Sequence, residues 1–576
     1  MAKVSSALLS EAFIKPIRFA LLLDDKFPTF PALADNKFDA ELDNGRAKAL
    51  FELCRSRGWL CDVGNRPSVA EQFENDNHLH QSDLLILDYN LDPADQNDPT
   101  AALHIIQKLA KSDHFNLVIV YTDSDSLSVT RDISYSLGAG KELTESQAAD
   151  AQVVIEDFDD EIVRKLTESF SQGILDDYIN GPAIRVSSET FRNELKAAKV
   201  APNVIPHVLV QWCRNRLELR LKPEILTQRQ PSRPVTSNLG PNNSPFWVTQ
   251  DNVFVAVVNK GKSAPDVLID LLEAAIASWD PSPLLVMMMQ ARAALEKAGT
   301  LADHKVLETS RLRAGWLLRI LLGDTEEARR DNVAELYGRL FERLATSVEP
   351  SIVDFGSRLI RPNPAESAVD TARSLAGAVH NMGAAQIYHA LNEHLCSDEC
   401  QDGGMTTGVV FRSTRGGKEQ YWVCVTPACD LVSGQNESGW DGELKPTRPA
   451  AVARLSLVKN QESVATILTN ATIGRHIFLY INNSPMAFEV TDDKSRQMSL
   501  ETIFLRDGGM LKAGRFFGHV IDLDGDGKPM VNELEFETLA KLRPDYANRL
   551  LTLSGSQRAR IGVDFFNLPA PKAATE

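Results

Sequence analysis

Short apolar runs alternate with amphipathic stretches along the first part of the chain. The runs at 17–23 (IRFALLL), 83–87 (DLLIL) and 117–121 (LVIVY) have the length and the mainly apolar character of buried parallel strands. Between them, the stretch 44–58 places apolar residues on one face at helical spacing. Strands separated by helices predict a doubly wound parallel α/β sheet, covered by helices on both faces, over residues 1–150.

The following segment, 151–262, is expected to connect two domains. It begins with acidic amphipathic helices and continues into a stretch rich in Pro, Ser and Asn at 228–252, which breaks any period. One clear strand, VFVAVV at 253–258, stands after it. We interpret this segment as connecting helices, a linker and a hairpin.

The last two expected domains differ in their hydrophobic period. Residues 263–396 are almost entirely helical in pattern, which predicts a helical bundle. From 397 to 576 the period is two, which predicts a small β barrel or sandwich, closed by a terminal helix at 533–553. The helices expected in the bundle are 263–278, 282–298, 302–322, 324–347 and 367–395.

Charge and hydropathy restrict the class of partner. The formal net charge of -17 argues against a broadly basic nucleic-acid surface, and no apolar run approaches the ~20 residues that cross a bilayer. We therefore expect a cytoplasmic protein that binds neither nucleic acid nor membrane. One basic cluster stands out, which we interpret as a solvated helix face: Arg214, Arg216, Arg220, Lys222, Arg229 and Arg233.

Acidic residues follow the predicted strands at their carboxyl ends. Asp24 and Asp25 come directly after the first strand, Asp88 after the LLIL strand, and Thr122 after LVIVY. The carboxyl ends of parallel strands meet at one edge of the sheet, where such folds place their functional crevice. Three converging carboxylates would hold a hard cation such as Mg²⁺.

This arrangement resembles the receiver domain of response regulators. The resemblance implies that Asp88 is the phosphoacceptor, that Asp24, Asp25 and Asp88 bind Mg²⁺, and that Thr122 is the switch hydroxyl. The family also has a lysine at the end of its fifth strand, for which Lys141 is the nearest candidate. A receiver that serves only as a docking module is the alternative.

Four cysteines in the C-terminal part raise the question of a metal site. Cys396, Cys400, Cys424 and Cys429 could supply the thiolates of a tetrahedral zinc site. Their spacings are looser than those of paired zinc knuckles, and Cys424 lies inside an apolar strand, so inert core thiols are the favoured alternative. A reactive Cys429 beside Asp430 is a third hypothesis.

The segment 522–533 (DLDGDGKPMVNE) matches the spacing of a calcium-binding loop. The run before it reads as a strand instead of a helix, and Pro529 occupies a position where an apolar residue normally pairs two such loops. A hairpin turn rich in Gly and Asp accounts for the same residues, and we favour it over calcium binding.

The stretches TPACDLV and LRPDYANRLL, near the C-terminus, are similar to those of uncharacterised bacterial proteins that join a receiver-like domain to a β-rich module. Genes of that group tend to accompany Hsp90-type, histidine-kinase-like ATPases in signalling or phage-defence clusters. The resemblance implies a regulatory or scaffold protein that forms an oligomer or a complex with such an ATPase. The alternative is an enzyme with an uncharacterised activity in the Cys429–Asp430 region.

Overall fold

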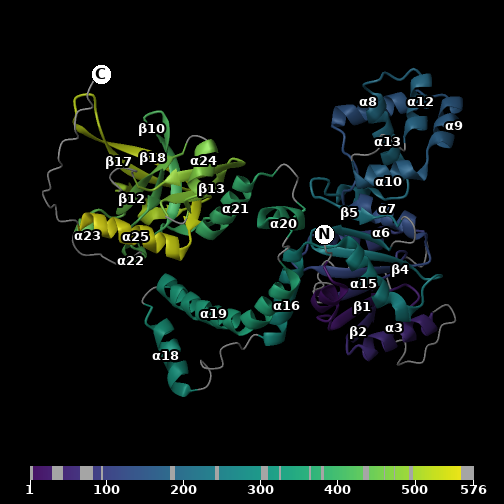
Figure 1. The fold of residues 1–576 in the computed structure, drawn as a ribbon, viewed down its shortest axis with the longest axis horizontal. Coiled ribbons are helices and arrows are strands. Elements are labelled where there is room, and N and C mark those ends of the chain that lie inside the picture. Colours follow the sequence, from purple (N-terminus) through teal and green to yellow (C-terminus); the bar gives the residue numbers. More distant parts are fainter. Residues whose placement is uncertain are drawn as a thin grey trace. The chain divides into compact units, whose positions relative to one another are not determined.

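The computed structural model divides the chain into two compact units, 1–362 and 363–576 (Figure 1). The structure describes residues 4–28, 43–64, 82–91, 95, 97–181, 188–240, 245–299, 309–323, 326–361, 365–377, 382–431, 440–458, 461–471, 474–491 and 497–559. No helix in these ranges is both long and apolar enough to cross a membrane.

Five parallel strands form the centre of the first unit, which confirms the predicted parallel α/β sheet. Their order is β2-β1-β3-β4-β7, and every residue of β3 and β4 is buried, as the unbroken apolar runs predicted. The strands are β1 (Phe19–Leu23), β2 (Leu60–Gly64), β3 (Leu84–Leu87), β4 (Asn116–Thr122) and β7 (Val253–Asn259).

The fifth parallel strand lies far along the chain from the fourth. β7 pairs with β4 from Asn116 opposite Val253 to Thr122 opposite Asn259. Two antiparallel strands, β6 (Phe246–Gln250) and β5 (Thr236–Asn238), extend the sheet beyond β7. The expected division at residues 150 and 262 therefore differs from the structure, because the segment between them returns to complete the same sheet.

One face of the sheet is covered by the chain start and by the helical middle. The cluster on this face includes Phe13, Leu50, Leu272 and Phe355. The helical middle is confirmed. The elements are α1 (Ser6–Leu9), η1 (Ser10–Ile14), α3 (Asn44–Ser56), η3 (Pro265–Val267), α15 (Leu268–Trp279), α16 (Pro283–Ala298) and α19 (Glu326–Leu359), with α18 (Ser310–Leu321) packed on α19. α15 packs against this sheet, and α16 and α19 add Val286 and Phe355 to the same cluster, whereas Leu317 and Leu321 of α18 and Phe341 of α19 are exposed.

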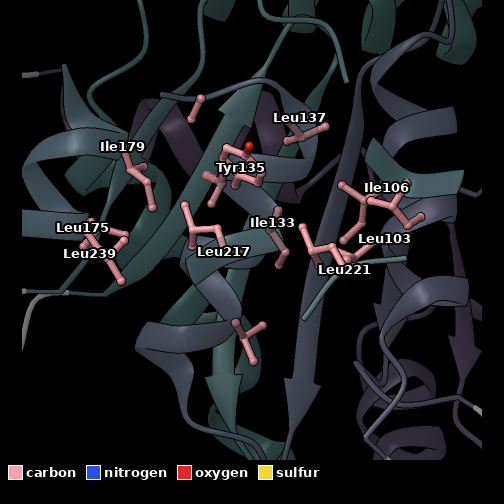
Figure 2. Packing of buried hydrophobic residues seen from close by; sticks show 14 of the residues in the cluster. Leu103, Ile106, Ile133, Tyr135, Leu137, Leu175, Ile179, Leu217, Leu221 and Leu239 are labelled. Atoms are coloured by element: carbon pink, nitrogen blue, oxygen red, sulfur yellow. The ribbon is translucent and has the colours of Figure 1, made fainter. Parts of the chain in front are cut away.

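The other face carries two helices of the sheet domain, α6 (Thr100–Ala110) and α7 (Ser126–Leu137). A helical lobe inserted between α7 and β5 packs against them, and Figure 2 shows apolar side chains of the two parts meeting in one cluster. We call the inserted segment 145–227 the lobe. Its helices are α8 (Glu145–Glu156), α9 (Asp160–Ser169), α10 (Gln172–Asn180), α12 (Glu189–Ala197), α13 (Ile205–Glu218) and α14 (Pro223–Thr227).

The second unit is built on a closed six-stranded antiparallel barrel, which confirms the β-rich C-terminal part. Strands β11 and β12 pair to close the order β11-β10-β18-β17-β15-β12. Stacked and edge-to-face contacts among Phe411, Trp422, Phe516 and Phe536 fill one side of the wall. The strands are β10 (Val409–Arg415), β11 (Lys418–Cys424), β12 (Arg448–Leu457), β15 (Ser499–Leu505), β17 (Arg515–Leu523) and β18 (Pro529–Leu542).

The second unit contains further elements outside the barrel. The helix expected at 533–553 is corrected, because its first part belongs to β18 and Pro544 begins a terminal helix, α25 (Pro544–Arg558). The others are α20 (Ala368–Leu375), α21 (Ala384–Cys396), β8 (Ser397–Asp398), β9 (Gly403–Gly404), α22 (Ala428–Leu431), α23 (Trp440–Glu443), α24 (Gln461–Leu468), β13 (His476–Ile481), β14 (Ser484–Glu489), η5 (Asp507–Gly509) and β16 (Met510–Leu511).

Candidate functional site

Three aspartates meet at the carboxyl edge of the parallel sheet. Asp24 and Asp25 follow β1, and Asp88 follows β3, which pairs directly with β1. One carboxylate oxygen of each residue lies within 4.8 Å of the others. Asp24 and Asp88 are buried, at 2% and 8% exposure. The sheet thus brings together the residues that the sequence placed at its strand ends.

The three carboxylates differ in how well they are hydrogen bonded. Asp24 Oδ1 accepts from the backbone N–H of Lys26 at 2.9 Å, and Asp88 Oδ1 accepts from that of Tyr89 at 2.8 Å. Asp25 Oδ1 is buried with no hydrogen-bond partner. Burial, followed by the neighbouring Asp24 charge, raises the pKa of Asp25. The cluster therefore contains an oxygen that lacks a partner for its negative charge.

A lysine that the sequence reasoning missed joins this cluster. Lys260 follows β7, and its Nζ lies 2.7 Å from Asp24 Oδ2 and 2.9 Å from Asp88 Oδ2. Burial alone would lower the pKa of Lys260, but the Asp88 and Asp24 carboxylates outweigh it and raise that pKa. Burial raises the pKa of Asp88 to about 6, against the opposing effect of Lys260. Lys260 is therefore a buried cation that pairs with Asp24 and Asp88.

Lys141 lies elsewhere. It is exposed in the segment after α7, where its backbone carbonyl accepts a hydrogen bond from Tyr178 Oη at 3.3 Å. The lysine in contact with the aspartates is Lys260 because β7, and not the segment near Lys141, is the fifth parallel strand. The run VFVAVVNK contained the signal: a strand buried on both faces that ends in a lysine.

Thr122 ends β4 beside this site and is buried. Its hydroxyl accepts a hydrogen bond from the backbone N–H of Ser124 at 3.2 Å, and its carbonyl accepts one from the backbone N–H of Lys260 at 2.8 Å. The position suits a hydroxyl that could contact a group bound to Asp88. The switch role of Thr122 stays a prediction.

The donor set fits a hard divalent cation. Within the part of the chain that the structure describes, these aspartates are the one group of three or more acidic, histidine or cysteine side chains close enough to share an ion. All their ligand atoms are carboxylate oxygens, which Mg²⁺ prefers. The unpartnered Asp25 oxygen would gain a ligand bond, so Asp24, Asp25 and Asp88 are the residues that could hold Mg²⁺.

The four cysteines proposed for zinc are not brought together among the described residues. Cys396 packs in the cluster that contains Tyr421, whereas Cys424 packs in the separate cluster that contains Trp422. Adjacent residues of a strand point to opposite faces, so the barrel wall separates these thiols. Cys400 packs beside the Cys424 cluster, and Cys429 is exposed with its thiol 3.5 Å from Asp430 Oδ1.

The calcium-like segment forms the hairpin that the sequence favoured. β17 and β18 pair as far as Leu523 opposite Pro529. Asp524 Oδ1 accepts from the backbone N–H groups of Asp526 and Lys528 at 2.9 and 2.8 Å. Asp522 forms an ion pair with Arg415. The aspartates therefore stabilise the turn and its flanking strands.

The basic cluster of the sequence is largely exposed, but most of its members form ion pairs within the first unit. Arg214 contacts Glu218 at 3.4 Å, and Arg229 contacts Glu142 at 3.0 Å. Further ion pairs join Arg214 with Glu142, Arg220 with Asp132, Lys222 with Asp98, and Arg233 with Asp251. These side chains mainly attach the lobe and the strands after it to the sheet domain.

Comparison with known proteins supports the interpretation of the first unit. Residues 16–171 match the family model of the response receiver domain. No curated protein and no solved structure gives a significant match. The matched range ends before β7 and so does not include Lys260. A receiver domain supports a signalling or regulatory role for the chain.

Proposed function

We propose that this protein is a signalling protein whose receiver domain accepts a phosphoryl group on Asp88, with Mg²⁺ held by Asp24, Asp25 and Asp88. The observation that supports this most is the contact of Lys260 Nζ with both Asp24 and Asp88. It supplies the fixed cation that an acyl phosphate needs at the end of the fifth strand.

The chemistry follows from the charges of the site. An oxygen of Asp88 attacks the phosphorus of a donor, the bond from phosphorus to its leaving group breaks, and Asp88 becomes an acyl phosphate. Bound Mg²⁺ would neutralise the charge that develops on the phosphoryl oxygens. Lys260 then pairs with a phosphoryl oxygen, and the Thr122 hydroxyl donates a hydrogen bond to another. Tyr89 N–H holds Asp88 Oδ1 in place during the transfer.

The donor we propose is a histidine-kinase-like ATPase of the Hsp90 type, in a two-component-like or phage-defence system. The support is the resemblance of the C-terminal stretches to proteins whose genes accompany such ATPases. Under this proposal the receiver takes part in a stable complex or oligomer. Co-purification of the tagged chain from its own host, with identification of any bound ATPase, tests the partner.

The phosphoacceptor role is tested by labelling the full chain with radioactive acetyl phosphate in the presence of Mg²⁺. We expect label on the wild type and none on Asp88→Asn. Asp123→Asn is the matched control, because Asp123 is an exposed carboxylate directly after Thr122. Label that persists in Asp88→Asn, or a wild type that takes no label, would contradict the proposal and leave the receiver as a docking fold.

A further inference from the structure

Helix α7 is enclosed by the inserted lobe. Residues 129–137 of this helix are all buried, although many of them are polar or charged. Figure 2 shows Ile133, Tyr135 and Leu137 of α7 in one apolar cluster with Leu175 and Ile179 of α10 and with Leu217 at the end of α13. The face of the receiver that α7 forms is therefore occupied by the chain itself.

Polar contacts also join the lobe and the segment after it to α7. The Arg131 guanidinium contacts Asp176 of α10 at 2.7 Å and also hydrogen bonds Gln172. Tyr135 Oη donates to Glu218 of α13 at 2.6 Å. The Arg229 guanidinium lies 3.8 Å from the centre of the Tyr135 ring and donates to two carbonyls at the end of α7.

A chain of polar contacts, buried at Tyr89 and Asp132, joins this interface with the acidic site. Tyr89 follows Asp88 directly, and its backbone N–H donates to Asp88 Oδ1. The Tyr89 hydroxyl donates to Asp132 Oδ2 of α7 at 3.0 Å, and Arg220, which follows α13, lies 3.4 Å from the same oxygen. Tyr89 and Asp132 are 2% and 1% exposed. A displacement of the Asp88 backbone therefore reaches the lobe through two contacts.

A second set of contacts connects the site with the start of α7. Asn90 Nδ2 donates to Ser124 Oγ at 3.1 Å, and Asn259 Nδ2 donates to the Ser124 carbonyl at 3.0 Å. Ser124 also hydrogen bonds the Thr122 hydroxyl. The loop before α7 is thus held by residues next to Asp88, Thr122 and Lys260 at once.

We propose that the lobe, residues 145–227, is the output element of this receiver, and that Tyr89, Asp132 and Arg220 couple it to Asp88. The inference rests on the proposed phosphoacceptor function. It follows that a protein that reads the modified state binds the lobe, since α7 is covered. Coupling between two sites is reciprocal, so the lobe also changes the affinity of the site for its ligands.

The test is hydrogen–deuterium exchange on the full chain, with and without Mg²⁺ and beryllium fluoride, which mimics a phosphoryl group on a carboxylate. We expect slower exchange in site peptides that include 82–91 and altered exchange in lobe peptides from α10 and α13. In Tyr89→Phe, which keeps the ring and the backbone N–H but loses the bond to Asp132, the site response should remain and the lobe response should fall at least about threefold.

Arg164→Ala is the matched control, because Arg164 is an exposed lobe residue that forms an ion pair with Glu168 of its own helix. It should keep both responses. Asp132→Asn provides a second variant, in which the beryllium fluoride affinity of the site should change by about fivefold or more, as reciprocity requires. The inference would be overturned if, in the wild type, exchange slowed at the site but did not change in the lobe. It would also be overturned if Tyr89→Phe and Asp132→Asn both kept the full change of exchange in the lobe. No response at the site itself would overturn the proposed function, and the inference with it.

Discussion

Replacing Lys260 with Met tests the electrostatic reasoning about the site most directly. The change removes the ammonium group from between Asp24 and Asp88, where its side chain is 4% exposed. At an effective dielectric constant near 20, each of these contacts corresponds to about 6 kcal/mol of attraction, and the desolvation of the ions offsets much of it. Removing one partner from a buried ion pair typically destabilises a protein by about 3–5 kcal/mol. We expect a loss of this size for the first unit in the absence of Mg²⁺.

Mg²⁺ should restore much of that loss. Without Lys260, three carboxylates face one another with no fixed cation, so the variant should gain more stability from Mg²⁺ than the wild type does. A ligand at 100 times its Kd adds about 2.7 kcal/mol to the free energy of unfolding. The pKa of Lys260 is raised in the folded state, so its contribution is fully present below the unfolded pKa near 10.5 and is lost as the pH rises through the folded pKa. Denaturant unfolding at pH 7 therefore measures the whole effect.

Two further lysines serve as controls. Lys262→Met removes an exposed ammonium two residues away, and Lys141→Met removes the lysine that the sequence suggested. Both should unfold within about 0.5 kcal/mol of the wild type, as surface substitutions usually do. A Lys260→Met protein as stable as these controls, or one that gains less from Mg²⁺ than the wild type, would refute the assignment of Lys260 to the site.

Two other predictions concern parts of the chain away from Lys260. Burial raises the pKa of Asp132 from 3.8 to about 6, so ionising it should lower the free energy of unfolding by about 3 kcal/mol as the pH rises from about 4 to 6. Asp132→Asn should remove this part of the pH dependence and leave the part due to Asp88. Denaturant titrations at pH 4, 5, 6 and 7 measure the free energy of unfolding of both proteins. If it varies with pH in the variant as it does in the wild type, the prediction is refuted. Trp422→Ala should destabilise the second unit by about 3–5 kcal/mol through the cavity it leaves, while calorimetry shows the Mg²⁺ response of the first unit unchanged.

The strands and the aspartates of the site could be predicted because their signals are local. Each of Asp24 and Asp88 follows its own apolar run directly, and the parallel sheet then brings the strand ends together. The barrel was predicted for a similar reason, since the alternation of its strands is visible within each run. Residues 533–542 were predicted as the start of the terminal helix but belong to β18. The boundary was missed because α25 begins only two residues after β18 ends.

The local signal of a lysine after a buried strand does not identify the partners of Lys260, because these lie far away in the sequence. The lobe separates β4 from β7, so the strand VFVAVV seemed to belong to a linker when it completes the receiver sheet. The interpretation of the basic cluster as a solvated face holds for Arg216, Arg220, Lys222 and Arg233, which are exposed, but the partners of these residues could not be identified for the same reason. Charges such as Arg220 have their partners on α7, and only the folded interface identifies them.

The long path between Asp24 and Lys260 has a consequence for synthesis on the ribosome. The two residues are 236 positions apart, so at about 5–20 residues per second the aspartates precede the lysine by on the order of 10–50 s. A nascent chain that has not yet reached β7 carries Asp24, Asp25 and Asp88 without Lys260 and without the fifth parallel strand. Translation thus completes the contact of Lys260 with Asp24 and Asp88 only after the lobe has been made, and a chain interrupted within the lobe lacks both β7 and Lys260.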